Sequence, residues 1–247
     1  MILSGHQPVY LPGIILFNKI ALSDSFMFVG HCQFCGGSWQ QRNMIASPDG
    51  RPIMLSVPTS GHFGASIDET LIQDTISANK WRRKHCASIR LSYSKRPHFH
   101  RYFKIIEEII RSPYKRIGFL NRALIAQCCE WLEIRASLLD SWKFKRPCEV
   151  LGTPDQPMIV GHKTDMLIQM CKATGIRSYL SNEGARAYVE TPLFEAAGLK
   201  HYWQKFEHPV YPQGRPVFIP NLSIIDLLFN VGPAAAEIVR TCGSVIE

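Results

Sequence analysis

The first thirty residues, Met1-Ile-Leu-Ser-Gly-His-Gln-Pro-Val-Tyr10-Leu-Pro-Gly-Ile-Ile-Leu-Phe-Asn-Lys-Ile20-Ala-Leu-Ser-Asp-Ser-Phe-Met-Phe-Val-Gly30, predict a strand, a loop, a helix and a second strand. Residues 1–4 and 26–29 are short apolar runs, typical of strands that are buried on both faces. Residues 14–22 are apolar on nearly every face, which predicts a helix packed against a sheet. This order indicates an α/β fold with a mainly parallel sheet.

The loop between the first strand and the helix is predicted to be rigid. Pro8 and Pro12 lack an N–H group and push the preceding residue into an extended conformation, which excludes helix and sheet. The loop follows the carboxyl end of a strand, where open α/β sheets bind ligands, and it carries His6, Gln7 and Tyr10. We expect His6 to act as an acid or base and the other two to bind substrate. The alternative is that they are packing residues.

The length and composition are those of a chain with a sizeable core. With 247 residues and 46% hydrophobic residues, we interpret residues 1–247 as one domain with a helical insertion at about 80–134, broken at Pro97 and Pro113. The apolar N-terminus lacks a basic region before it, which argues against a signal peptide. No apolar run approaches the roughly 20 residues that span a bilayer, so we expect a cytoplasmic protein.

The eight cysteines are scattered, and only His31-Cys32-x-x-Cys35 has the spacing of metal ligands. A structural zinc site needs four ligands, and the fourth would have to come from a distant residue. Free thiols are the default in a cytoplasmic protein. We therefore predict no metal site, and the sequence identifies no cofactor.

The net charge of +8 is concentrated in the segment 75–106, which has no acidic residue and nine Lys or Arg residues. Such a segment attracts anions, so we expect its basic side chains, including Lys84, to border the substrate site. A basic surface without a ligand is the alternative. Trp81, His85 and Ile89 recur every four residues, so His85 either faces the core or binds substrate.

Three other stretches supply candidate binding residues. Residues 38–46 and 52–58 alternate about a Ser-Pro-Asp-Gly turn and predict a β-hairpin, whose Trp39, Arg42 and Asn43 suit a ligand wall or a half-exposed hairpin. Residues 177–181 predict a strand, followed by a loop with Ser181, Arg186 and Tyr188. Between them, the connector 143–157 holds a possible short strand at 150–151, and Thr164 is expected to cap the next helix.

The final motif is Asn221-Leu-Ser-Ile-Ile-Asp-Leu-Leu-Phe-Asn-Val-Gly232. Ser223 is expected to cap a helix in which Asp226 and Asn230, four residues apart, share one face. A carboxylate and an amide would then point together, either into a site or into water.

These motifs, taken together, resemble the WbqC-like family, which occurs among gene products for bacterial surface polysaccharides. The similarity covers the whole chain: His6-Gln-Pro-x-Tyr-Leu-Pro with Phe17 and Lys19, Ser38-Trp-Gln-x-Arg-Asn43, Trp81 with Lys84-His85, Tyr179-Leu-Ser181 with Tyr188, Tyr211-Pro-Gln213 and the final motif. Family members usually carry two aspartates after the second strand. Gly30 and His31 stand there instead, so any function of those carboxylates is lost here or rebuilt with His31.

The leading hypothesis is a group-transfer enzyme acting on a phosphate-bearing or nucleotide-linked small molecule in surface-polysaccharide or specialised metabolite biosynthesis. Alternatives are aminoacyl or acyl transfer from a charged tRNA or other large anionic donor, and a non-catalytic ligand-binding protein. The expected catalytic residues are His6, His31 and Asp226. The expected substrate-binding residues are Gln7, Tyr10, Lys19, Trp39, Arg42, Asn43, Lys84, His85, Ser181, Arg186, Tyr188, Gln213 and Asn230.

Overall fold

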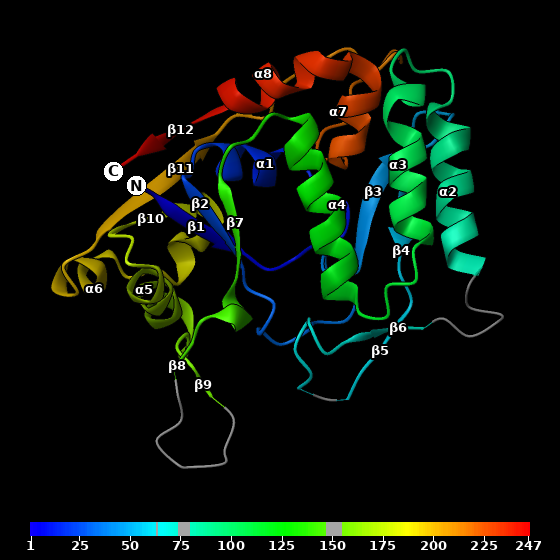
Figure 1. Ribbon diagram of the computed structural model, residues 1–247. Helices are drawn as coiled ribbons and strands as arrows, with labels where there is room; N and C mark the ends of the chain where they lie inside the picture. The colour runs from blue at the N-terminus through cyan, green and yellow to red at the C-terminus, as the bar shows by residue number, and fades with distance from the viewer. Residues whose placement is uncertain (63, 74–79, 147–154) are drawn as a thin grey trace.

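The computed structural model describes residues 1–62, 64–73, 80–146 and 155–247, and its centre is a six-stranded sheet (Figure 1). The strand order is β12-β11-β10-β1-β2-β7, and every neighbouring pair is parallel except β11 with β12. The α/β fold class with a mainly parallel sheet is thereby confirmed. The strands are β1 (Leu3–His6), β2 (Ser25–Phe28), β7 (Ser137–Asp140), β10 (Ser178–Asn182), β11 (Lys200–Phe206) and β12 (Gly243–Ile246).

The predicted strand, loop, helix and strand at the N-terminus are present, with β1 two residues later than expected and α1 at Ile14–Ala21. The loop is held at three carbonyls. The amide of Asn43 donates to the carbonyls of Tyr10 and Leu11, at 3.2 and 2.8 Å, and that of Asn121 donates to Pro8, at 3.0 Å. The backbone of this loop is therefore fixed by two distant segments as well as by its prolines.

Helices cover both faces of the sheet. The helices α1, α7 (Ile224–Val231) and α8 (Ala235–Thr241) lie on one face, and α5 (Lys163–Thr174) and α6 (Thr191–Ala196) lie on the other. A parallel sheet needs this cover because its apolar side chains point both ways. Leu3 and Met27 pack with α5 and α6, whereas Phe26 and Phe28 pack with the α1 side.

Between β2 and β7 the chain forms a hairpin and three helices, on the right of Figure 1. The antiparallel hairpin of β3 (Arg42–Ala46) and β4 (Pro52–Ser56) and the helical breaks near Pro97 and Pro113 agree with the sequence predictions. The helices are α2 (Lys80–Tyr93), α3 (Phe99–Arg111) and α4 (Ile117–Trp131), and the short β5 (Thr59–Ser60) and β6 (Leu71–Ile72) precede them. The interpretation of the chain as one domain with this insertion stays a prediction.

Some elements differ from expectation. The edge strands β7 and β12 had no clear pattern in the sequence, because both are only four residues long and half-buried at most positions. Thr164 does not cap α5. Its hydroxyl accepts from the N–H of Glu190 at 3.0 Å, and His162 is the residue at the cap. The short strand expected at 150–151 falls on residues 147–154, which lie outside the described residues. The strand β8 (Lys145–Arg146) precedes this stretch, and β9 (Gln156–Pro157) follows it.

Arg122 of α4 ties the insertion to the end of the sheet. Its guanidinium pairs with both carboxylate oxygens of Asp68, at 2.5 and 2.7 Å, and also with Asp140 at the end of β7. All three side chains are largely buried. Arg122 meets Asp68 in fork geometry and Asp140 through Nε, so its removal would leave two buried carboxylates unpaired.

The Asp68 and Arg122 side chains occupy the space that a side chain at Gly30 would need. We therefore expect Gly30→Ala to force the ion pair apart and to lower the free energy of unfolding by roughly 2–4 kcal/mol, measured by urea denaturation. Gly36→Ala is the matched control, because nothing lies within 4 Å of a Cβ atom there. Equal stability of the two variants would show that the Asp68–Arg122 pair can relax without cost.

Candidate active site

The gap between β1 and β10 is a topological switch point of the sheet. From β1 the chain crosses through α1 to β2 on one side, and from β10 it crosses through α6 to β11 on the other. The two strands pair only at Leu3 with Tyr179 and Ser4 with Leu180, although β1 continues to His6 and β10 to Asn182. The strands thus separate at their carboxyl ends, which is where open α/β sheets bind ligands.

Two cavities flank this gap. An apolar cavity of about 430 Å³ lies on the α1 side, and a polar cavity of about 320 Å³ lies on the α5 side. His6, Lys19 and Asn182 line both. The apolar cavity is also lined by Val9, Ile14, Ile15, Leu16, Trp39 and Phe206, and the polar cavity by Gln7, Cys32, Ser181, Gly184 and Tyr188. None of the described residues that line either cavity is Asp or Glu.

His6 is half-buried and its tautomer follows from its partner. Nδ1 lies 2.7 Å from the carbonyl oxygen of Gln7, which can only accept, so Nδ1 carries the hydrogen. Burial, with the nearby Lys19 as a second cause, lowers the pKa of His6 to about 4. At neutral pH the ring is therefore uncharged, and Nε2 has a lone pair that can accept a proton from a substrate.

Lys19 is a buried cation without a carboxylate partner. Its side chain is 4% exposed, and its Nζ donates to the carbonyl of Gly5 at 2.9 Å. No carboxylate of the described residues lies within the 4.0 Å of an ion pair with Nζ. Burial lowers the pKa of this ammonium to about 7. Because Nζ has three hydrogens and one goes to Gly5, two remain for a ligand.

A chain of hydrogen bonds orients the amide of Gln7. The backbone N–H of Cys35 donates to Oε1 of Gln40 at 2.8 Å, so Nε2 of Gln40 is the group that donates to Oε1 of Gln7, at 2.7 Å. The Gln7 side chain lines the polar cavity, so the NH₂ group left over is a donor there. The backbone N–H of Cys35 thus determines the orientation of the Gln40 amide, and the Gln40 amide determines that of Gln7.

Ser181 adds a hydroxyl donor to the polar cavity. Its Oγ lies 2.9 Å from Nε2 of His201, whose Nδ1 is buried and has no partner among the described residues. A buried N–H without an acceptor costs more than an unused lone pair, which favours the tautomer with the hydrogen on Nε2. His201 then donates to Ser181, and the Ser181 hydroxyl hydrogen is free for a ligand.

The comparisons with known proteins agree with the motifs. The model of the WbqC-like protein family matches residues 7–238 of this chain. The chain belongs to the WbqC-like protein family. It is also 29% identical, over 239 residues, to an uncharacterized protein of Mycobacterium tuberculosis, Rv1507c, and the match covers 96% of each chain.

This WbqC-like chain places seven of the expected site residues at the gap: His6, Gln7, Lys19, Trp39, Asn43, Ser181 and Tyr188. Trp39 is 51% exposed at the apolar cavity. Asn43 lines the same cavity, but its amide is committed to the Tyr10–Leu11 backbone, so it is a wall residue. Arg186 lines neither cavity and lies over the Trp203 ring, 4.4 Å from its centroid.

Other expected site residues lie elsewhere, in the core. Tyr10 and His85 are both buried and hydrogen-bond each other, 2.9 Å from hydroxyl to Nδ1. Burial lowers the pKa of His85 to about 4, so the pair is uncharged. The expectation that they contact substrate therefore does not match their position, and both connect the N-terminal loop to α2. Arg42, on β3, also lines neither cavity.

Asp226 and its neighbours form a separate buried cluster. Its carboxylate accepts from the hydroxyls of Tyr93 and Tyr211, at 2.9 and 3.0 Å, and Arg215 lies 3.7 Å away. Asn230 donates to the Asp226 carbonyl, and the Gln213 amide holds the backbone of Ile219. Asp226 is fully buried and lines neither cavity, so a proton-transfer role for it has no geometric support. Ser223 caps α7 as expected.

His31, which was expected to be a catalytic residue, lines neither cavity. It is exposed, and its Nδ1 lies 2.7 Å from the Ser141 hydroxyl. Nor does it join Cys32 and Cys35 in a metal site, since the described residues contain no group of three His, Cys, Asp or Glu side chains placed to hold a metal ion.

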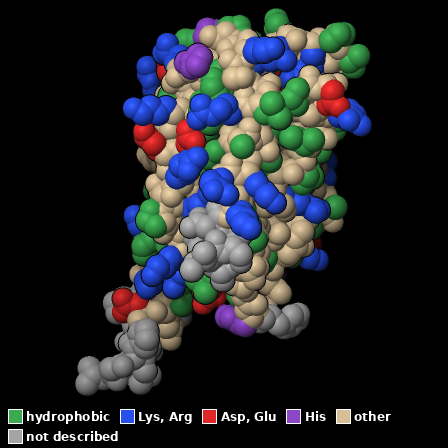
Figure 2. Space-filling model, turned by 90° about the vertical axis from the view of Figure 1, so that its right-hand side faces the viewer, with side chains coloured by type: hydrophobic (Ala, Val, Ile, Leu, Met, Phe, Trp, Pro, Cys, Tyr) green, Lys and Arg blue, Asp and Glu red, His purple; other side chains and the backbone are tan. Residues whose placement is uncertain are grey.

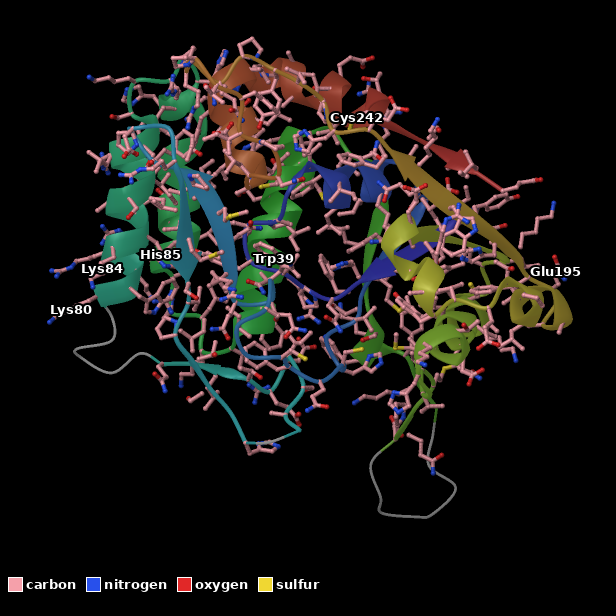
Figure 3. The ribbon with its side chains drawn as sticks, turned by 180° about the vertical axis from the view of Figure 1, so that it is seen from behind. Trp39, Lys80, Lys84, His85, Glu195 and Cys242 are labelled. Atoms are coloured by element: carbon pink, nitrogen blue, oxygen red, sulfur yellow. The ribbon has the colours of Figure 1, made fainter. Side chains whose placement is uncertain are left out.

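The basic segment also differs from expectation in its position. Figure 2 shows Lys and Arg side chains spread over the outer face of the insertion, and Figure 3 shows Lys80 and Lys84 at the outer edge of the molecule, on the side of α2 away from Trp39. No basic residue of 75–106 lines either cavity. The segment therefore forms a basic surface apart from the gap.

No helix among the described residues is long and apolar enough to cross a membrane.

Asn182, Gln204 and His201 are among the residues at the site that had not been expected. Asn182 could have been included, since it directly follows Ser181 at the end of a predicted strand. Gln204 and His201 depend on the register of β10 with β11, which pairs Tyr179 with His201 and Asn182 with Gln204. The register of these two strands could not be predicted from the sequence.

The lowered pKa of Lys19 gives a test of its burial. Between pH 7 and 10.5 the unfolded chain holds a proton on this amine that the folded chain has released, so folding becomes more favourable as pH rises. We expect wild type to gain up to a few kcal/mol relative to Lys19→Met from pH 7 to pH 10, measured by urea denaturation. Lys84→Met, at an exposed site, is the control. The same pH trend in both variants would contradict the assignment.

Proposed function

We propose that this protein is a group-transfer enzyme whose substrate carries a phosphate or a similar anionic group, in surface-polysaccharide or specialised metabolite biosynthesis. The observation that carries the proposal is the Lys19 ammonium, which is buried at the gap between β1 and β10 and has no carboxylate partner there. A buried ammonium without an anion is costly, and a bound anion would offset that cost.

The polar cavity supports the choice of an anion. The Gln7 amide and the Ser181 hydroxyl add uncharged donors to Lys19, and Tyr188 adds a hydroxyl at the rim. Phosphate oxygens accept several hydrogen bonds at once, which suits a wall made of donors. The volume of about 320 Å³ fits a small molecule.

The reaction follows from what His6 can do. An acceptor hydroxyl or amine gives its proton to Nε2 of His6 and attacks the electrophilic atom of the donor. The bond from that atom to the phosphate oxygen breaks, and the electron pair stays on the oxygen. Lys19 stabilises the negative charge that develops there, as cationic groups do in phosphoryl-bearing sites.

A second function, acyl or aminoacyl transfer from a charged tRNA, is favoured by the basic outer face of the insertion (Figure 2). If the protein has this function, tRNA must bind through the basic side chains of the outer face. The double variant Arg83→Glu with Lys84→Glu, both exposed on α2, should then abolish salt-dependent tRNA retention on a filter. Retention that is absent in wild type at 50 mM salt would remove this candidate.

The leading function predicts the behaviour of Lys19 toward phosphate compounds. We expect at least one member of a panel of nucleoside diphosphate sugars, sugar phosphates and pyrophosphate to bind wild type. Lys19→Met should weaken it about tenfold or more, because a hydrogen bond to a charged group contributes about 1.5–3 kcal/mol. Binding should also weaken above pH 7, where Lys19 loses its charge. Calorimetry measures both, with Lys84→Met as the control.

For a compound of this panel that is turned over, His6→Asn should lower kcat by roughly 10²–10⁴-fold and leave binding within a few-fold. Asparagine keeps a donor for the Gln7 carbonyl but has no base. Binding of neutral sugars alone, with no response to any anion, would overturn the proposed function.

A further inference from the structure

The two cavities lie on opposite faces of the sheet and meet at its gap. Alternate residues of a strand point to opposite faces. Gly5, Tyr179 and Ser181 line the polar cavity on the α5 side, whereas Gln204 and Phe206 line the apolar cavity on the α1 side. The residues common to both are His6 and Asn182, which end the two diverging strands, and Lys19.

The chemistry of the two cavities differs. The polar cavity presents the donors of Gln7, Lys19 and Ser181. The apolar cavity is bounded mainly by aliphatic side chains of α1 and by the ring of Trp39, which is half-exposed although it is a large apolar group. A ring left open beside an apolar cavity gives a planar or branched apolar group a surface to cover.

We infer that the two cavities are separate subsites of one transfer reaction, which deepens the proposed function and rests on it. The phosphate-bearing donor binds in the polar cavity, and an acceptor with an apolar body, planar enough to stack on Trp39, binds in the apolar cavity. The reacting atoms meet at the gap, beside Nε2 of His6 and Nζ of Lys19. Each substrate then reaches the gap from its own face of the sheet.

This arrangement explains why the shared wall consists of His6, Lys19 and Asn182. A base must touch the acceptor, and a cation must touch the leaving phosphate, while both stay close to each other. Nζ of Lys19 donates to the carbonyl of Gly5, the residue next to His6, at 2.9 Å, so the two groups are close. His6 is accessible from the apolar cavity, and Lys19 reaches the polar one, so one pair of side chains serves both substrates.

The test uses two probes with the full-length protein: pyrophosphate for the polar cavity and the neutral fluorophore N-phenyl-1-naphthylamine for the apolar cavity. We expect both to bind together, so that saturating pyrophosphate changes the dissociation constant of the fluorophore less than threefold. Calorimetry follows pyrophosphate, and fluorescence follows the naphthylamine.

Two matched variants separate the subsites. Gly184→Leu adds bulk at the polar cavity, where a Cβ atom meets only the Asn182 amide at 3.7 Å, and should weaken pyrophosphate at least tenfold. Trp39→Ala removes the half-exposed ring and should weaken the naphthylamine at least fivefold. Each variant should leave the other probe within twofold. Thermal unfolding of both variants confirms that they are folded.

The outcomes distinguish this inference from the proposed function. Failure of pyrophosphate to bind wild type counts against both. Pyrophosphate binding with mutual exclusion of the two probes, or with both variants affecting both probes, overturns the two-subsite inference and leaves the anion site in place. Failure of the naphthylamine to bind wild type overturns the inference as well.

Discussion

The separation of β1 from β10 is the constraint on which the site depends. Each strand must begin a crossover in the opposite direction, so the helices α1 and α6 lie on opposite faces and cannot cover the gap between the strands. Pairing ends at Ser4 with Leu180, two residues before either strand ends. The backbone groups and side chains beyond that point face a space which no element of the sheet fills. His6 and Asn182 are directed into it by the strands themselves.

Lys19 differs from the other buried charged side chains in how it is compensated. Arg122 is bound by two carboxylates, Arg82 by the carbonyls of Ile110, Ser112 and Tyr114, and Asp226 by two tyrosine hydroxyls with Arg215 nearby. Those three groups are held by the protein and stabilise its structure. Lys19 donates one hydrogen bond, to the carbonyl of Gly5, and its side chain lines both cavities. The uncompensated charge is thus located where a ligand can reach it, which is typical of a functional group rather than a structural one.

The sequence predicted those parts of the fold that local pattern determines. The N-terminal strand, loop and helix, the hairpin and the helices of the insertion are each encoded within short stretches. The ends of predicted strands likewise pointed to His6, Gln7, Ser181 and Tyr188, which line the cavities. Contacts between side chains far apart in the sequence could not be predicted from it. The sequence could not show that Tyr10 and His85, 75 residues apart, satisfy each other in the core, since a histidine and a tyrosine suit a core and a site equally well. For Asp226, the partners Tyr93 and Tyr211 come from other segments, and they decide between a buried cluster and a catalytic acid.

In the region after β2, a carboxylate has a structural role. Gly30 and His31 follow the strand where the resemblance to the family led us to expect aspartates, and the missing carboxylates pointed to a lost or rebuilt function. In the structure a carboxylate does lie beside Gly30, but it belongs to Asp68, and Arg122 binds both this carboxylate and that of Asp140. The absence of a Cβ atom at Gly30 makes room for that ion pair, which fixes α4 against the end of the sheet. The acidic groups at this end are therefore committed to a structural cation, and none of them is available to neutralise Lys19. Under the proposed function, the charge of Lys19 remains for a substrate.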